Sequence, residues 1–70
     1  MHKLNFKNTN GKWIEEFHFP RVPQKGEQFT IIKENEKVEY ITYFIVEVHS
    51  VYNMLASSYS FNITVEDITD

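Results

Sequence analysis

The side chains best suited to acid–base chemistry and metal binding are three histidines, which stand far apart in the chain at His2, His18 and His49. A tetrahedral zinc site needs four ligands, often in closely spaced pairs, and the chain has no cysteine to supply thiolates. Two histidines follow a glutamate at a spacing of two, in Glu16/His18 and Glu47/His49, so each pair shares one face of a strand. On neighbouring strands these pairs would form a four-ligand cluster, but outward-facing solvated pairs are the favoured reading. The sequence predicts no metal site.

Hydrolytic chemistry has weaker support still. A general acid–base pair needs one desolvated and one ionised carboxylate across a cleft, and a chain of 70 residues is short for enclosing one. The serines Ser57, Ser58 and Ser60 have no histidine beside them, and no nucleophile-elbow motif is present. The only two glycines, Gly11 and Gly26, stand too far apart for a phosphate-binding loop. We therefore expect no enzyme activity and no cofactor.

Nucleic-acid binding is a more serious hypothesis, because small barrels bind single strands by stacking bases on aromatic side chains beside basic ones. Trp13 follows Lys12, and Arg21 and Lys25 share one loop. The net charge of −3 argues against it, since phosphate contacts dominate affinity. The charges are unequally divided: residues 1–35 carry six cations and four anions, and residues 36–70 carry one cation and six anions. This division is a weak pointer to a polarised surface.

Binding of a protein partner, or of a second copy, is the leading hypothesis. Tyrosine, tryptophan and arginine are the residue types that carry most interface energy. The predicted partner-binding residues are Trp13, Arg21, Lys25, Tyr43, Tyr52 and Tyr59. Packing inside a barrel, with the hydroxyl at the rim, is an equally good reading for each tyrosine. A homodimer through the strand face that carries Ile41, Tyr43 and Ile45 is one variant, and an acidic mimic of DNA is another.

Length and composition limit the remaining choices. Seventy residues form one domain, here residues 1–70, whose core is marginal at this size. No disulfide is available to support it, so the six Phe, four Tyr and one Trp are expected to do so. No apolar run near Met1 is typical of a signal peptide, and no segment has the length of a membrane span. We expect a cytoplasmic protein without a membrane partner.

The pattern of apolar residues predicts an all-β chain. Alternation of period two and turn-forming residues between the segments indicate strands over residues 3–8, 12–19, 27–33, 38–51 and 59–65. Asn10-Gly11 is a strong hairpin signal, and the loop of residues 19–27 contains Pro20, Pro23 and Gly26. Residues 52–58 are expected to form a loop or a single helical turn, and the acidic tail after residue 65 is expected to fray.

Two of these strands have imperfect patterns. In the strand over 12–19, Trp13, Phe17 and Phe19 share one parity but Glu15 interrupts them, and a β-bulge near Glu15-Glu16 would restore the register. The strand over 38–51 is far longer than usual and is apolar on both faces in its middle. We expect it either to bend and serve two halves of a barrel or to present one face to a partner.

Five strands without a clear helix favour a small SH3-like barrel. An OB-type barrel is an alternative, although it usually has a helix between its third and fourth strands, where this chain has only the short turn of residues 34–37. A simple antiparallel meander is the third possibility.

A local motif carries a resemblance to known proteins. Pro20-Arg21-Val22-Pro23-Gln24-Lys25-Gly26-Glu27 is followed by Phe29-x-Ile31 and later by Tyr43-Phe44-Ile45-Val46-Glu47-Val48. Over residues 17–49 the chain resembles small uncharacterised bacterial and phage proteins with a Pro-Arg-x-Pro-x-x-Gly-Glu loop before a strand. The resemblance implies a small SH3-like barrel and no catalytic residues.

Overall fold

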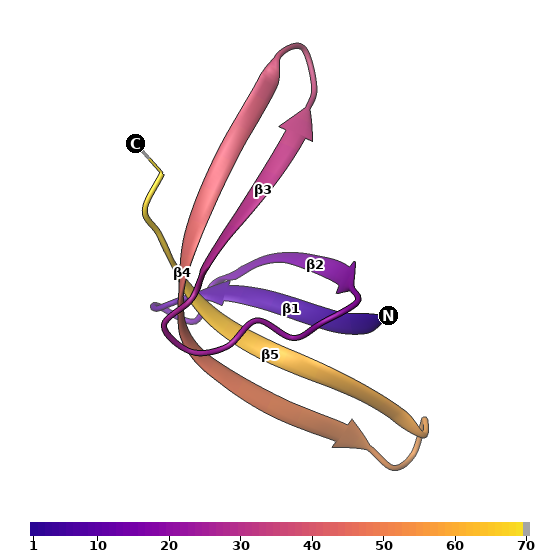
Figure 1. Cartoon of the computed structure of the whole chain (residues 1–70). Coiled ribbons are helices and arrows are strands. Elements are labelled where there is room, and N and C mark those ends of the chain that lie inside the picture. Colours follow the sequence, from indigo (N-terminus) through magenta and orange to yellow (C-terminus); the bar gives the residue numbers. More distant parts are fainter. Residues whose placement is uncertain (70) are drawn as a thin grey trace.

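The computed structural model describes residues 1–69, which form five β-strands joined by short connections (Figure 1). The strands are β1 (His2–Asn8), β2 (Trp13–Phe19), β3 (Gln28–Glu34), β4 (Val38–Asn53) and β5 (Ser58–Asp67). These bounds confirm the predicted strands to within about two residues, and the described residues include no helix. Residues 54–57 form a turn, and β5 continues through Asp67 where a frayed tail was expected. The last residue of that tail, Asp70, lies outside the described residues.

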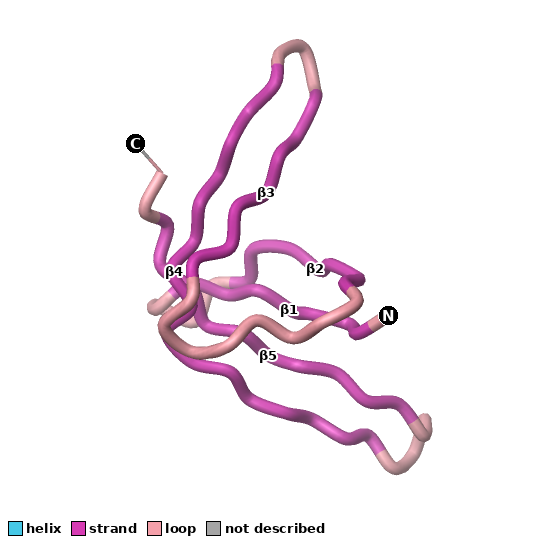
Figure 2. The backbone as a smooth tube through the Cα atoms, in the orientation of Figure 1, coloured by secondary structure: helices cyan, strands magenta, loops and turns pink. Residues whose placement is uncertain are grey.

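All five strands belong to one sheet in the order β2-β1-β5-β4-β3. The neighbours β1–β2, β5–β4 and β4–β3 are antiparallel, whereas β1 and β5 run parallel. The alternative of a simple antiparallel meander is therefore excluded, because β1 lies beside β5 and β2 does not pair with β3. The sheet curls into a half-barrel, with β2 and β3 at its two edges (Figure 2).

The β1–β2 hairpin is closed by the predicted Asn-Gly turn. The Asn8 amide donates to the Lys12 carbonyl at 2.8 Å, and the Gly11 amide donates to the Asn8 carbonyl at 2.9 Å. Gly11 has a φ of 82°, in the left-handed region that favours glycine. The predicted bulge exists but lies earlier than expected: Phe6 is opposite Glu15 and Lys7 is opposite Trp13, so Ile14 is the extra residue. Trp13 consequently faces the same side as Lys7, away from the core.

A second bulge bends β4. Ile45 is opposite Val65 and Glu47 is opposite Thr64, which leaves Val46 as the extra residue. The bulge shifts the alternation by one position, so Ile45 and Val48 face the same side of the sheet. Unbroken alternation would have placed these two side chains on different faces of the sheet. The predicted bend is present, and the two halves of β4 enter different hairpins (Figure 1).

The core lies on the concave side of the curled sheet. Its buried members come from the three central strands: Leu4, Phe6, Tyr43, Ile45, Ile63 and Val65. The Phe6 ring sits at the centre and makes edge-to-face contacts with Phe17, Phe29 and Tyr43, at centroid separations of 5.0, 5.3 and 5.7 Å. Such edge-to-face contacts add to the burial of apolar area, which gives this small core its cohesion.

Two hairpins extend beyond this core and give the molecule an open, V-like outline (Figure 1). We call residues 30–42 the β3–β4 arm and residues 49–61 the β4–β5 arm. Between the two sheet edges, Lys33 of the β3–β4 arm donates to the Glu15 carboxylate of β2 at 2.7 Å. This ion pair ties the edges together where no strand pairing does.

Candidate interaction surface on the β4–β5 arm

The tip of the β4–β5 arm displays the most exposed apolar side chains of the described residues that are not terminal. Leu55 is fully exposed and Met54 is 82% exposed. The turn that carries them is well formed, because the Asn53 Oδ1 accepts hydrogen bonds from the amides of Leu55 and Ala56 at 3.0 and 3.2 Å. Ser57 completes the turn with a φ of 49°, in the left-handed region. The apolar tip is thus held in a defined shape.

An aromatic stripe connects this tip to the body of the molecule. Tyr52 and Tyr59 are directly opposite in the β4–β5 ladder, with ring centroids 6.1 Å apart, and both are more than half exposed. Tyr59 contacts Phe61 at 5.1 Å, and Phe61 contacts the His2 ring edge to face at 5.6 Å. Phe61 is half-buried against the core, whereas Tyr52 and Tyr59 lie on the same side of the sheet beyond the start of the β1–β5 ladder and remain exposed.

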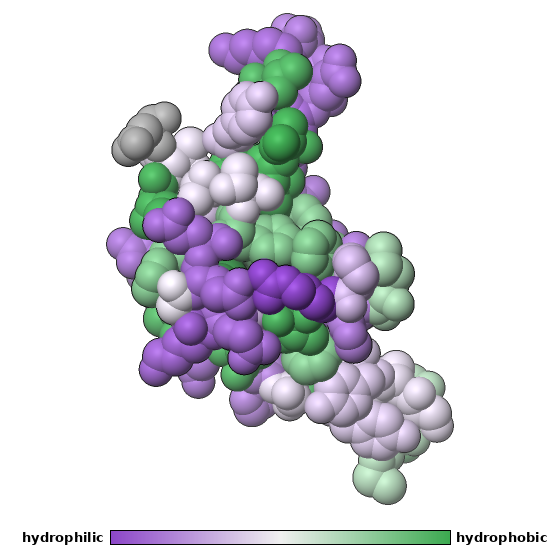
Figure 3. All heavy atoms as spheres, in the orientation of Figure 1, coloured by the Kyte–Doolittle hydropathy of each residue, from purple (hydrophilic) through white to green (hydrophobic). Residues whose placement is uncertain are grey.

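The whole arm is uncharged. From Ser50 to Val65 the sequence has no Lys, Arg, Asp or Glu, so the arm differs from the rest of an otherwise highly charged chain. Figure 3 shows this arm at the lower right as pale and green atoms, set apart from the purple polar band across the centre of that face. Sequence reasoning found Tyr52 and Tyr59 but missed Met54 and Leu55. The length of the uncharged run was the signal that could have found them.

The other predicted binding residues do not join this surface. Tyr43 is only 6% exposed and packs against Phe6, and burial raises the pKa of its hydroxyl. It therefore belongs to the core, and its burial leaves little of its surface for the partner contact that the sequence predicted. The strand face considered for a homodimer lies in the same core, because Ile45 is fully buried and Ile41 packs against the core.

The two basic residues of the proline loop have separate roles. Arg21 forms a two-pronged ion pair with Glu27, at 3.1 and 2.6 Å, and Glu27 also accepts from the Gln24 amide at 2.7 Å. The Arg21 guanidinium lowers the pKa of Glu27 to about 2. Arg21 is thus occupied in holding the loop, while Lys25 is exposed. The loop docks on β4 through bonds between Gly26, Glu27 and Ile45.

Trp13 lies at the opposite end of β1 from the arm. It is 55% exposed and stands beside Lys7 on the outer side of the sheet. The arm begins near Lys3, which pairs with Ser60. Trp13, Arg21 and the two exposed tyrosines therefore form no single cluster with one another.

The two histidine–carboxylate pairs do not meet. Glu47 and His49 are on β4, and Glu16 and His18 are on β2, with β1 and β5 between them. The hydrogen bond from His18 at 3.0 Å lowers the pKa of Glu16 within its own pair. Within residues 1–69 no group of three or more His, Asp or Glu side chains is arranged to hold a metal ion.

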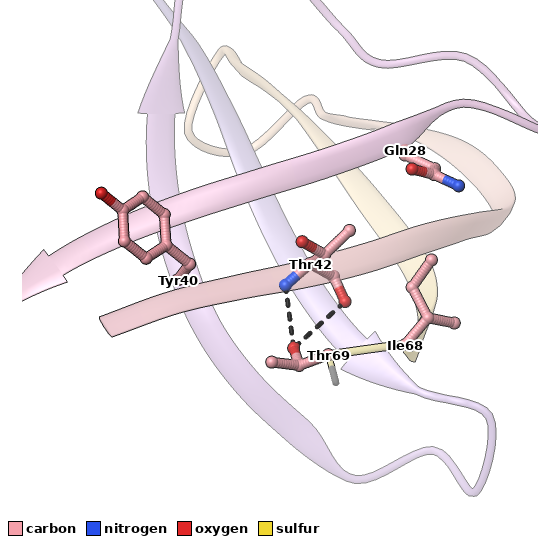
Figure 4. A pocket seen from close by; sticks show the side chains of 5 residues that line it. All are labelled: Gln28, Tyr40, Thr42, Ile68 and Thr69. Carbon is pink, nitrogen blue, oxygen red and sulfur yellow. Dashed lines mark hydrogen bonds between the residues drawn. The ribbon is translucent and has the colours of Figure 1, made fainter. Parts of the chain in front are cut away.

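A shallow pocket on the outer side of the β3–β4 arm is formed by Gln28, Tyr40, Thr42, Ile68 and Thr69 (Figure 4). The Thr69 hydroxyl accepts from the Thr42 amide at 2.9 Å, and the Ile68 amide donates to the Thr42 carbonyl at 2.9 Å. The C-terminal segment thereby continues the β4 pairing by one step beyond β5. The pocket has no buried titratable group, so we assign it no chemistry.

On the convex side of the sheet the centre is polar. Asn5 is 9% exposed and donates to the Asn62 side chain at 3.1 Å, while its own Oδ1 lacks a hydrogen-bond partner among the described residues. This pair fixes two neighbouring strands rather than forming an accessible site.

Comparisons with protein-family models, with curated proteins and with solved structures found no match for this chain. In the part of the chain that the structure describes, no helix has the length and apolar character needed to span a membrane.

Proposed function

We propose that the protein is a non-enzymatic interaction module that binds a protein partner through the β4–β5 arm. The observation that supports this most strongly is the arm's apolar tip, with Leu55 and Met54 displayed on an ordered turn. Exposing two large apolar side chains and two tyrosines costs solubility, so such a patch marks an interaction site more often than an ordinary surface. A turn that is already ordered also loses little entropy on binding.

The chemistry of the arm indicates the kind of partner. The arm is apolar at its tip and uncharged along its length, with tyrosine hydroxyls at its sides. A matching surface is an apolar groove with a few polar groups at its rim and little charge. In such a groove Leu55 is the anchor, and the tyrosines contribute the flat contact area typical of interface hot spots.

A peptide library displayed on phage and selected against the immobilised protein tests this proposal. We expect enriched peptides to be apolar and to lose affinity by about tenfold or more with Leu55→Ser. Val38→Ser is the matched control, since Val38 is 51% exposed on the other arm and its loss should leave affinity unchanged. Peptides whose affinity is insensitive to Leu55→Ser, or equally sensitive to Val38→Ser, would contradict the proposal.

Single-stranded nucleic acid is the second candidate, favoured by the stripe of Tyr52, Tyr59 and Phe61 as a stacking platform. The ion pair of Arg21 with Glu27 and the absence of charge on the arm weigh against it. A labelled oligothymidine should show no change in fluorescence anisotropy. A salt-sensitive change that Tyr59→Ala removes would favour this candidate over a protein partner.

With this function we propose an SH3-like class for the fold, supported by the five strands, the bend of β4 and the curl of the sheet.

A further inference from the structure

The β3 strand forms an open edge of the sheet whose backbone groups can be identified from the hydrogen bonds of its neighbour. The Thr42 amide and carbonyl bond to Thr69 and Ile68, on the side of β4 away from β3. Thr30, directly opposite Thr42, is therefore in a non-hydrogen-bonded pair, and its own amide and carbonyl point to the free edge. By the two-residue period of a strand, Gln28, Ile32 and Glu34 present theirs in the same direction.

The two edges of the sheet differ in how they are protected. Proteins usually protect an edge strand with bulges, prolines or charges. The β2 edge has the Ile14 bulge and is followed by Pro20. The β3 edge has no bulge, since its ladder with β4 is regular from Gln28 to Glu34, and it contains no proline. Its two charged residues are Lys33, which is engaged by Glu15 on the concave side, and Glu34, which is the last residue of the strand.

From these observations we infer that β3 is a self-association edge, at which β3 of a second copy adds antiparallel about a two-fold axis through Ile31. This pairing places Gln28 opposite Glu34 of the second copy and Thr30 opposite Ile32, and these are the residues whose backbone groups face the edge. This register directs the free backbone groups of the two strands toward each other, and it also gives the longest possible overlap of the two strands. A shift by two residues in either direction shortens the ladder.

Charge and side-chain chemistry agree with a second copy as the occupant. In this register no like charges are directly opposite, since Glu34 faces Gln28 and Lys33 faces Phe29 of the second copy. On the outer side, Ile32, which is 64% exposed, comes to lie beside Thr30 of the second copy. The β3–β4 arm projects from the body (Figure 1), and in the described sheet β4 is the one strand that pairs with β3. This edge is separate from the β4–β5 arm, so the inference extends the proposed function.

Sedimentation equilibrium over a range of protein concentrations tests the inference, with Thr30→Pro as the main variant. Proline removes an amide that faces the free edge, so it breaks no internal ladder bond but blocks pairing with a second copy. We expect a reversible dimer in the wild type and a dissociation constant raised by at least about tenfold in Thr30→Pro. Thr30→Val is the matched control: it loses the 3.1 Å hydroxyl contact with Thr42 but keeps the amide, and should dimerise normally.

A second pair of variants guards against misfolding of the proline variant. Ile32→Lys places a charge on the edge and should weaken the dimer, because the two introduced lysines lie diagonally across the seam. Tyr40→Lys, on the same face, similarly exposed and one strand further in, should not. A wild type that stays monomeric at millimolar concentration, or a dimer that survives both Thr30→Pro and Ile32→Lys, would overturn the inference. Leu55→Ser should leave the dimer intact, which separates this result from the fate of the proposed function.

Discussion

At the scale of single residues, Arg21 and Glu27 show how a charged pair in a conspicuous loop can serve structure and not binding. The sequence predicted Arg21 as a partner-binding residue because arginine is among the residue types that carry most interface energy. Its guanidinium instead donates to the carboxylate of Glu27, the residue immediately before β3. Glu27 also accepts a hydrogen bond from the Gln24 amide. The pair holds the loop in the shape that lets Gly26 and Glu27 bond to Ile45 of β4.

The ion pair makes the free energy of unfolding depend on pH, because Glu27 must be ionised to form it. Its pKa falls from the ordinary 4.5 to about 2 on folding, so the folded state binds fewer protons than the unfolded state between these values. The stabilisation is therefore complete above about pH 4.5 and is lost as the pH falls toward 2. We expect Glu27→Gln to lower the urea midpoint at pH 6 and to flatten its decline between pH 4.5 and 2.

Urea unfolding of the wild type and Glu27→Gln at a series of pH values provides the measurement. Glu34→Gln is the control, because Glu34 is an exposed carboxylate of the same type that makes no ion pair among the described residues. Parallel pH profiles for the wild type and Glu27→Gln would show that the ion pair contributes nothing. The effect should be modest, since exposed pairs are screened by solvent.

The tyrosines show which part of the candidate site a sequence can supply. Tyr43 and Tyr52 both occur in β4 and look equivalent by type and by neighbourhood. Tyr43 is buried because the Phe6 ring packs against it, at a centroid separation of 5.7 Å. Tyr52 is 58% exposed because it is opposite Tyr59, and the ladder between β1 and β5 starts only at the next residue of β5, Ser60. Alternation assigns a side chain to a face, but only the placement of distant strands determines whether that face is covered.

At the scale of elements, the structure of the β4–β5 arm depends on its turn, since a two-stranded hairpin beyond the core has few other supports. The Asn53 side chain satisfies two amides of the turn. We expect Asn53→Ala to destabilise the arm by about 1 kcal/mol, as for the loss of a helix cap. Nitrogen-15 relaxation should then show increased mobility at residues 54–57, and peptide affinity for the tip should fall with Leu55 still present.

Asn10→Ala is the matched control for this change. Asn10 is an exposed turn asparagine whose side chain makes no hydrogen bond among the described residues. It should alter neither the urea midpoint nor the relaxation of residues 54–57. If Asn53→Ala behaves in the same way, the turn is held by its backbone alone.

The elements themselves could be predicted because their signals are local. The Asn-Gly turn, the proline loop and the alternation of apolar residues each involve only a few neighbours in sequence. The two bulges were harder to place. A bulge at Ile14 and one at Glu15-Glu16 repair the same pattern, and only the partner strand distinguishes them. The bulge at Val46 left almost no trace, because β4 is apolar on both faces there.

At the scale of the whole molecule, the distinguishing feature is that a small core supports two extended hairpins. The radius of gyration is 12.7 Å, against about 11 Å for a compact chain of this length, and the longest dimension is 40 Å. The parallel pairing of β1 with β5 joins the first and last strands, and no local pattern in the sequence indicated it. This pairing sets which segments are central and which project.

Amide hydrogen exchange should therefore be slow at the centre of the long strand β4 and fast at its two ends. We expect the amides of the central strands around Phe6, Ile63 and Val65 to exchange at least about a hundredfold more slowly than paired amides in the arms, because buried apolar contacts surround only the centre. Both ends of β4 should exchange quickly even though its ladders are regular there. Uniform protection along β4 would mean that the sheet opens as one unit and that the arms are not independent.

Hydrogen exchange repeated at high protein concentration also tests whether the β3 edge pairs with a second copy. If the β3 edge pairs with a second copy, protection should rise at Thr30 and Ile32, whose amides face the edge. Their neighbour Ile31 already donates into the β4 ladder and should change less. The β4–β5 arm should keep its fast exchange, because its proposed occupant is a different protein. Concentration-dependent protection at residues 52–59, with none at Thr30, would instead place self-association on the arm.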